Sequence, residues 1–131
     1  MTIHEDQYVD QAQAVIQKLS NKKNPRTGRL EPMVTTSKIR NLLAIAADIY
    51  NEVLNCRTEQ LNEEIKGRIE YLRVRFTYES GRDTKVKEFV EGAKLLDYLK
   101  EIKGSKQNYI LFHHYMEALI AFHRFYNGKD M

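Results

Sequence analysis

Basic residues recur at helical spacing in the middle of the chain, and their side chains are of the kind that binds phosphate. Arg68 and Arg75 are seven residues apart and so share one face of a helix, and Arg82 follows after seven more. A guanidinium group makes bidentate contacts to phosphate oxygens, which give affinity without reading a base sequence. Interleaved aromatic residues fit a nucleic-acid backbone as the ligand. The same spacing is also compatible with a helix that binds an acidic protein.

A second group of candidate phosphate ligands lies at the start of another expected helix. Lys38 and Arg40 fall in its first turn, where free backbone N–H groups and the positive end of the helix dipole also favour anions. Thr36 and Ser37 could donate further hydrogen bonds to a phosphate or could cap the helix, and capping is the favoured interpretation. The sequence therefore predicts an anion-binding surface assembled from two segments.

Residues for catalysis or metal binding form no recognisable pattern in the sequence. The phosphate-loop, dinucleotide, nucleophile-elbow, zinc-protease and paired-cysteine motifs of common enzymes are all missing. His113, His114 and His123 lack the spacing to face one metal ion, and we expect them at partly buried edges or at a subunit contact. Cys56 is expected to pack structurally. We therefore expect a protein that is not an enzyme and that holds neither a metal ion nor another cofactor.

Apolar residues recur every three or four positions along most of the chain, and this periodicity predicts helices. The clearest helix begins after Thr35-Thr36-Ser37, which are all plausible N-cap residues, and keeps its apolar stripe from Ile39 to Leu54. No alternating run long enough for a strand is present. We expect an all-α fold, a single-domain bundle of about five helices. Besides the helix after Ser37, the expected helices span about residues 5–19, 58–81, 84–103 and 105–126.

Two of these helices are rich in aromatic residues and carry expectations about burial. In the helix predicted from residue 58, Tyr71, Val74 and Tyr78 form a second apolar stripe, which implies burial on more than one side. Gly81 is expected to end that helix with a positive φ angle. The last helix is apolar almost all round. We expect it either at the centre of the bundle or with a spare face for a partner.

Length and composition indicate one domain over residues 1–131, with 42% hydrophobic and 30% charged residues. Residues 1–34 are expected to form a helix and a basic loop rich in proline and glycine, which is either mobile or an ordered arm. Residues 35–126 are expected to form the helical core. No apolar run approaches the length of a membrane span, and the single cysteine fits a reducing compartment, so we expect a cytoplasmic protein without a membrane partner.

The net charge of +3 is small, but the charges are distributed in blocks. Residues 20–42 carry six basic and one acidic residue, and residues 66–87 carry seven basic and three acidic residues. Acidic blocks alternate with these basic ones. Such a chain can present an anion-binding surface despite its modest total charge, although solvated helix faces would show the same pattern.

Three segments resemble sequence motifs of one known family. Thr35-Thr36-Ser37-Lys38-Ile39-Arg40 is similar to the TTSx(I/L)R signature of the small subunits of type III-A CRISPR–Cas (Csm) effector complexes. Residues 70–82 resemble the stretch YL(R/K)…F.Y.(A/S)GR of that family, and residues 115–126 resemble Y(M/F)EALVA(Y/F)…YY. Each motif alone is only moderately specific, but the three occur in the family's order over about residues 35–126.

This resemblance implies a small α-helical subunit without an active site of its own. Several copies of such subunits stack beside the repeat backbone subunits that hold the crRNA. Together they line the channel in which crRNA pairs with target RNA, and they help couple target capture to the large signalling subunit. The implied partners are therefore crRNA, target RNA, other Csm subunits and further copies of the chain itself.

The resemblance also assigns residues to this role. The positions that match family motifs are carried over as RNA-facing or assembly-facing sites: Ser37, Arg40, Arg73 and Arg82. Three further RNA-binding candidates rest on the charge pattern alone: Lys38, Arg68 and Arg75. Such contacts should stabilise the guide–target duplex without regard to its sequence, because base pairing already reads the sequence.

Two other classes of function compete with this interpretation. One is a dimeric helical adaptor, which would bind a protein partner through its C-terminal aromatic helix and leave its basic face solvated. The other is a small helical enzyme, which is disfavoured because the sequence offers no nucleophile, metal cluster or cofactor loop. The adaptor would show a salt-insensitive hydrophobic interface and no affinity for RNA.

Overall fold

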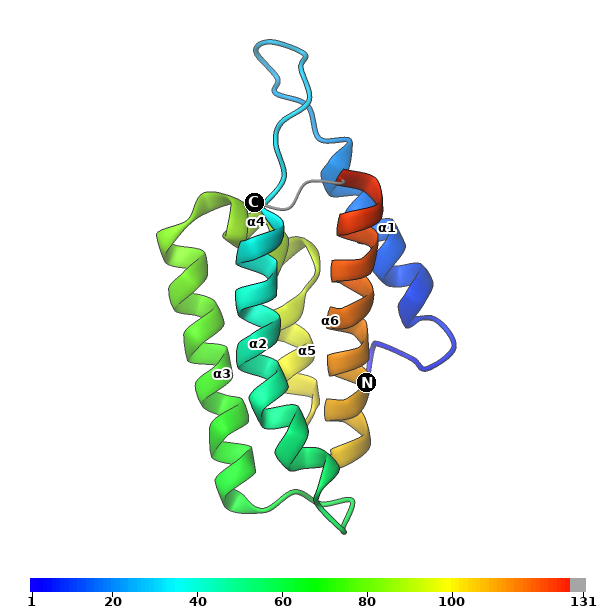
Figure 1. Cartoon of the computed structure of the whole chain (residues 1–131), viewed down its shortest axis with the longest axis vertical. Helices are drawn as coiled ribbons and strands as arrows, with labels where there is room; N and C mark the ends of the chain where they lie inside the picture. Colours follow the sequence, from blue (N-terminus) through cyan, green and yellow to red (C-terminus); the bar gives the residue numbers. More distant parts are fainter. Residues whose placement is uncertain (128–131) are drawn as a thin grey trace.

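The computed structural model describes residues 1–127, and within that range it has an all-α architecture (Figure 1). The prediction of an all-α, single-domain fold is confirmed, with six helices in the described range rather than about five. The helices are α1 (Tyr8–Ser20), α2 (Thr36–Leu54), α3 (Glu63–Arg82), α4 (Thr84–Gly92), α5 (Leu95–Glu101) and α6 (Lys106–Asn127). None of them combines the length and the apolar character needed to span a bilayer.

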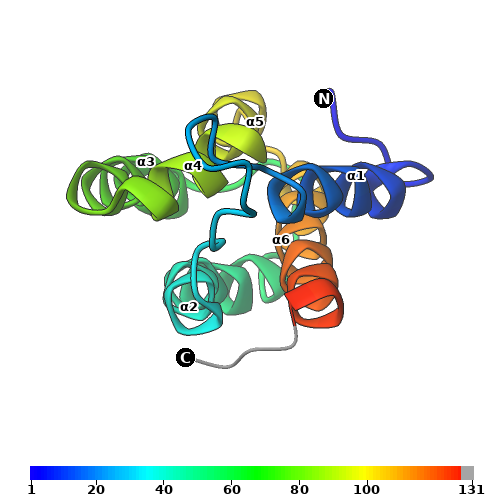
Figure 2. The ribbon, with the colours of Figure 1, turned by 90° about the horizontal axis from the view of Figure 1, so that it is seen from above.

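The helices pack around one core, with α6 at its centre. Viewed from above, α2 and α6 lie on one side, α3, α4 and α5 on the other, and α1 packs against α6 (Figure 2). α3 lies at the edge of the bundle and contacts α2, α4 and α5. Each of the longer helices contributes side chains that are almost fully buried, such as Ile16, Ile39, Phe76 and Phe112. The burial of this apolar surface is the main stabilising term of the fold.

The helix predicted over residues 84–103 is in fact two helices, α4 and α5. Lys94 adopts a left-handed conformation with φ 57°, which ends the regular α-helical path. The preceding residue, Ala93, is completely buried, and its carbonyl oxygen accepts a hydrogen bond of 2.9 Å from the hydroxyl of Tyr115 on α6. The chain turns at this point so that both short helices can pack on the core.

The start of α3 lies later than predicted, at Glu63 instead of Thr58. The intervening residues are held by tertiary contacts, since the backbone N–H of Leu61 donates to the carbonyl oxygen of Gly104 at 2.8 Å. The side chain of Asn62 then caps α3 by accepting a hydrogen bond from the backbone N–H three residues later. The predicted start was wrong because this capping residue was not recognised.

Two further helix ends differ from the predictions. Gly81 does not end α3 with a positive φ, because the helix continues to Arg82. The positive φ occurs instead at Gly104, after α5, where the prediction also placed a helix end. At the N-terminus, α1 begins at Tyr8 rather than at residue 5, since a turn precedes it in which the carbonyl of His4 accepts two backbone hydrogen bonds.

The segment between α1 and α2 forms an ordered arm, one of the two alternatives that the sequence left open. The backbone N–H of Asn24 donates to the carbonyl of Arg29 at 2.8 Å, and the N–H of Glu31 donates to the carbonyl of Lys22 at 2.9 Å. Gly28, with φ 70°, closes the turn. The arm projects from the end of the bundle at which α2 starts (Figure 1).

The two aromatic-rich helices differ in burial. The second apolar stripe of α3 is exposed, with 61% of Tyr71, 57% of Val74 and 59% of Tyr78 accessible, so the prediction that it is buried was wrong. On α6, by contrast, Tyr109 and Phe112 are fully buried, which places this helix at the centre of the bundle. Its first three aromatic residues therefore belong to the core, whereas Phe125 near its end is 76% exposed, so little of the aromatic face that the adaptor hypothesis requires is accessible.

Candidate nucleic-acid interface

A groove runs between the antiparallel helices α2 and α3. The part beside the start of α2 has a volume of about 510 Å³, and a second part of about 430 Å³ continues along the helices. The two parts share Ile45 from α2 and Arg75 from α3, so they form one surface, which we call the α2–α3 groove. It is open to solvent and is lined by side chains of both helices.

Four of the seven predicted RNA-binding residues line this groove: Lys38, Arg68, Arg75 and Arg82. The three arginines succeed one another along α3, as their seven-residue spacing predicted, and Lys38 faces them from the first turn of α2. Four acidic residues line the same groove: Asp48, Glu64, Glu79 and Asp83. The groove therefore combines both signs of charge over an apolar floor that includes Leu42 and Ile45.

The other three predicted residues lie outside the lining of the groove. Arg73 is two residues from Arg75 and so points roughly 200° away around α3. Its guanidinium donates to Glu70 at 2.7 Å, and its Nε is buried without a hydrogen-bond partner. Ser37 and Arg40 are exposed in the first turns of α2, one helical turn before the groove residues Asn41 and Ala44, respectively.

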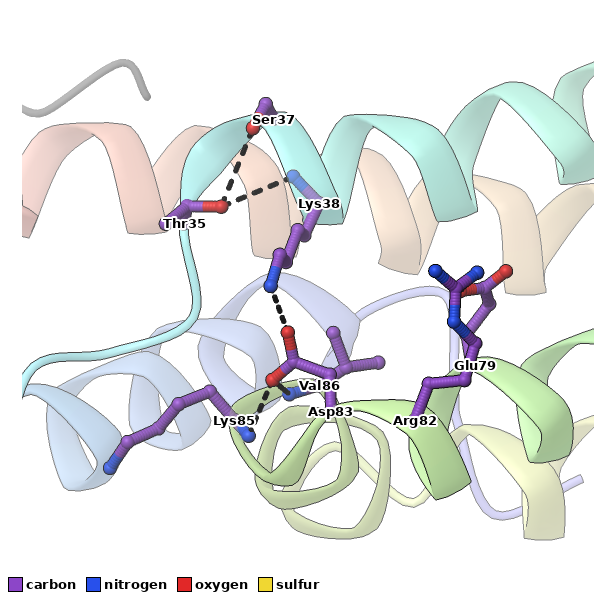
Figure 3. A network of polar contacts seen from close by, with 8 residues as sticks. All are labelled: Thr35, Ser37, Lys38, Glu79, Arg82, Asp83, Lys85 and Val86. Atoms are coloured by element: carbon purple, nitrogen blue, oxygen red, sulfur yellow. Dashed lines mark hydrogen bonds and ion pairs between the residues drawn. The ribbon is translucent and has the colours of Figure 1, made fainter.

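The N-terminus of α2 is capped by Thr35, whose side-chain oxygen accepts a hydrogen bond from the backbone N–H of Lys38 at 3.4 Å (Figure 3). Of the three plausible capping residues, Thr35 is therefore confirmed, whereas the expectation that Thr36 and Ser37 act as caps was wrong. The hydroxyl of Ser37 instead lies 3.4 Å from that of Thr35, and Thr36 is buried inside the first turn. Ser37 remains accessible at the end of the groove.

Asp83 joins α2, α3 and α4 at one point (Figure 3). One carboxylate oxygen caps α4 by accepting from the backbone N–H groups of Lys85 at 2.9 Å and Val86 at 3.2 Å. The other oxygen pairs with the ammonium group of Lys38. This ion pair and the two backbone hydrogen bonds lower the pKa of Asp83. Sequence reasoning missed Asp83, although its position directly before the predicted start at Thr84 is typical of a capping residue.

The three groove arginines differ in their partners. Arg82 lies 3.3 Å from Glu79 and is positioned over the ring of Tyr78, 5.5 Å from the centroid, while Arg68 pairs with Glu52. Arg75 has no ion pair or hydrogen bond within residues 1–127. Ion pairs at the surface contribute little to stability, so Arg68 and Arg82 can exchange their partners for another anion at low cost.

The two basic blocks of the sequence meet at one end of the molecule. The first supplies the arm and the start of α2, and the second supplies the end of α3 and the start of α4, which lies beside them (Figure 1). Lys22 and Lys85 both pair there with Glu31 and Glu88. Hydrogen bonding to Glu88 raises the pKa of Lys22. Bases outnumber acids in both blocks.

Two of the histidines are buried more deeply than predicted. His113 stacks on Tyr50 with 3.9 Å between ring centroids, and His123 donates from Nε2 to the carbonyl oxygen of Val34 at 2.7 Å. Nδ1 of His123 lies 3.4 Å from the hydroxyl of Thr36. Burial lowers the pKa of both histidines. They serve the core, and within residues 1–127 no cluster of three metal-ligating side chains exists.

The fold and the α2–α3 groove define a small all-helical protein in which arginines of one helix line a groove. Comparison with known proteins gives the family: the model of the family Csm2 Type III-A matches residues 9–129. The chain is 39% identical over 130 residues to the CRISPR system Cms protein Csm2 of Mycobacterium tuberculosis, and the match covers 99% of both chains. It is 38% identical over 126 residues to the protein of the same name from Streptococcus thermophilus, with 96% of each chain covered.

A third relative, Csm2 from Enterococcus italicus, is 39% identical over 100 residues, which cover 74% of this chain and 71% of the relative. The chain therefore belongs to the Csm2 family, the small subunits of type III-A CRISPR systems. The family that the three sequence motifs resembled is confirmed. The match also includes most of the N-terminal region, for which the motifs gave no information.

Proposed function

We propose that this protein is a non-catalytic small subunit of the type III-A Csm complex, and that its α2–α3 groove lines the channel that holds crRNA and target RNA. The observation that carries this proposal is the row of arginines that α3 presents along the groove, in a chain of the Csm2 family. In this proposal, RNA cleavage and signalling belong to other subunits, and the complex acts in the cytoplasm.

The groove arginines would contact phosphates and riboses of the guide–target duplex. Arg75 is the leading candidate, because its guanidinium has no competing ion pair in the described chain. Lys38, Arg68 and Arg82 would exchange their carboxylate partners for phosphate oxygens, with which both lysine and arginine form charge-assisted hydrogen bonds. Contacts of this kind position a duplex without selecting its sequence.

The remaining candidate residues would extend this surface or serve assembly. Ser37 and Arg40 would contact RNA at the end of the groove, next to the accessible first turn of α2. Arg73 faces away from the groove, and we assign it to contacts with other Csm subunits. In this division, residues 35–126 carry the RNA-facing surface, and residues 1–34 add α1 and the basic arm.

Affinity would arise from several copies acting on one duplex. A single chain offers few phosphate contacts, and each contact competes with acidic residues of the same groove, such as Glu79 and Asp83. We therefore expect weak binding of free RNA by the isolated chain. Several copies beside the repeat backbone subunits would bind the same RNA with a much larger combined affinity. That binding should weaken as salt concentration rises.

Co-expression with the repeat backbone subunit and a crRNA, followed by native mass spectrometry, tests the membership of the complex. We expect particles that carry RNA and more than one copy of this chain, and we expect those copies to be lost together at high salt. A chain that never joins an RNA-bearing particle would contradict the proposal. The same preparation with the arginine variants described below then tests the groove itself.

A further inference from the structure

The basic arm between α1 and α2 concentrates positive charge in a short stretch of sequence. Residues 21–30 include four cations and no acidic residue; the cations are Lys22, Lys23, Arg26 and Arg29. All four residues are exposed. None of them lines the α2–α3 groove, so the arm has no part in the site described above.

The arm is ordered by its own hydrogen bonds. Besides the backbone hydrogen bonds and the β-bridge between its two sides, the N–H of Gly28 donates to the carbonyl of Asn24 at 2.8 Å. The side chain of Asn24 also accepts a hydrogen bond of 2.8 Å from the backbone N–H of Arg26. Because these contacts hold the tip in shape, a ligand that binds there meets a preformed surface, and little ordering cost opposes the binding.

Ion pairs at the base attach the arm to the bundle. The ammonium group of Lys22 lies 3.1 Å from the carboxylate of Glu88 on α4. On the returning side of the arm, the carboxylate of Glu31 lies 3.2 Å from the ammonium group of Lys85, which is also on α4. Both carboxylates are thus engaged by lysines at the base, and neither pairs with a cation of the tip.

The three cations farther along the arm have no competing partner in the described part of the chain. The side chains of Lys23, Arg26 and Arg29 form neither an ion pair nor a hydrogen bond there. Among the groove cations, by contrast, only Arg75 shares this property, and the others each pair with a carboxylate. An anion that reaches the arm therefore does not have to displace an acidic side chain.

The chemistry of the tip suits the phosphate backbone of a nucleic acid. Guanidinium groups bind phosphate oxygens through paired hydrogen bonds, and a lysine adds a point charge. A protein partner would require an apolar centre in the interface. Between Asn24 and Arg29, however, Pro25 is the only apolar side chain. Leu30 is 61% exposed, but a single exposed aliphatic side chain is ordinary at a protein surface.

The arm and the groove meet at the same end of the bundle. The arm projects from the end at which α2 starts (Figure 1), and the groove residues Lys38 and Arg82 lie at the start of α2 and the end of α3. An RNA backbone that follows the arginines of α3 as far as Arg82 would therefore leave the groove beside the arm.

We propose that the arm is a second RNA-binding site, which contacts phosphates of the target RNA and makes the first contact as that RNA arrives. This inference rests on the proposed function, since it takes RNA as the ligand of the complex. Unpaired, exposed charges attract an approaching polyanion before close contact is made, so they mainly set the rate of association. The groove arginines engage the RNA afterwards and mainly set the rate of dissociation.

The kinetics of target binding by the assembled complex test this division of roles. The arm variant combines Lys23→Gln, Arg26→Gln and Arg29→Gln. The matched control removes the same charge from exposed residues after α2 and at the end of α5, the end of the bundle opposite the arm (Figure 1), and combines Arg57→Gln, Lys100→Gln and Lys103→Gln. All six residues are exposed, so both variants should fold normally, which circular dichroism would verify.

At low salt we expect the arm variant to bind target RNA roughly tenfold more slowly than the wild type. The control should bind at the wild-type rate, because charges more than about 10 Å from the RNA are screened at 0.1 M salt. The difference between the two variants should disappear as the salt concentration rises. Equal association rates for the arm variant and its control would overturn the proposal.

Arg75→Ala in the same assay distinguishes the arm from the groove, because it changes the groove and leaves the arm intact. Slower association of the arm variant supports the arm site even if Arg75→Ala leaves dissociation unchanged, a result that would count against the groove alone. Faster dissociation of Arg75→Ala with normal association of the arm variant would overturn the arm site alone.

Photo-cross-linking tests the contact itself. Target RNA that carries 4-thiouridine should cross-link to a peptide that contains residues 23–29. Cross-linking of Lys23 to another Csm subunit by a lysine-reactive reagent, together with unchanged association of the arm variant, would show that the arm binds a protein and would overturn the proposal.

Discussion

Helices α6 and α3 both carry aromatic residues, six on α6 and three on α3, yet the structure uses most of them in opposite ways. On α6, the rings of Tyr109, Phe112 and Tyr115 are buried, because α1, α2 and α5 surround this helix. On α3, Phe76 is buried but Tyr71 and Tyr78 are exposed, because the bundle covers only one side. Position within the bundle, and not aromatic content, decides which rings form the core.

The polar groups of α6 and α3 also differ in their burial. The buried hydroxyl of Tyr109 donates to the carbonyl oxygen of Ala46 at 2.6 Å, and burial raises the pKa of this tyrosine. Such buried hydrogen bonds leave no group available for a ligand. On α3, Arg75 and Arg82 lie in an open groove. α6 therefore serves stability, and α3 carries the surface available for recognition.

The largest expected effect comes from truncating a core ring on α6. Phe112→Ala should lower the free energy of unfolding by about 3–5 kcal/mol, because it removes a fully buried side chain and leaves a cavity. Tyr71→Ala on α3 should change it by less than about 0.5 kcal/mol. Urea unfolding of both variants measures the difference. Similar losses of unfolding free energy for the two variants would contradict the assignment of Phe112 to the core and of Tyr71 to the surface.

A smaller effect is expected from the buried histidine that links α6 to the segment before α2. His123→Leu should lower the free energy of unfolding by about 1–3 kcal/mol, because the carbonyl of Val34 loses its 2.7 Å hydrogen bond inside the protein. Urea unfolding at pH 8 measures this loss without a contribution from protonation. An unchanged free energy of unfolding would show that a water molecule makes the hydrogen bond to the carbonyl of Val34 in place of the histidine.

The pH dependence of stability should report the same buried histidines. Burial holds the pKa of His113 and His123 below the ordinary value of 6.5, so the unfolded chain binds more protons than the folded chain below that pH. Their contribution to stability is therefore complete above about pH 6.5 and is lost as the pH falls. Unfolding free energies between pH 8 and pH 5 should decline, and His123→Leu should decline less steeply. A profile flat over this range would contradict the burial of both rings.

The sequence predicted the elements better than their junctions. The apolar stripe from Ile39 to Val53 identified α2, Thr84 is the first residue of α4, and Gly104 lies in the turn between α5 and α6. The break at Lys94 could not be predicted, because lysine carries no turn preference and the break depends on how Ala93 packs beneath Tyr115. Helix signals are local, whereas this turn is imposed by tertiary contacts.

The geometry of the candidate site was likewise only partly predictable from the sequence. The seven-residue spacing of Arg68, Arg75 and Arg82 was sufficient to place them on one face. The pairing of Lys38 with Asp83 was not predictable, because these residues are brought together only when α2 and α3 pack antiparallel. Spacing along a helix is fixed by its geometry, but the element that covers each face depends on the whole fold.

The most direct test of the central claim is the retention of target RNA by the assembled complex when this chain carries Arg75→Ala. Dissociation should be followed for two unrelated target sequences over a series of salt concentrations, with Lys100→Ala, at an exposed residue of α5, as the control. We expect weaker retention of both targets, with a salt dependence reduced by about one phosphate contact for each copy, and no change for the control. Unchanged retention by Arg75→Ala, or a loss for only one of the targets, would contradict a groove that binds the RNA backbone without reading its sequence.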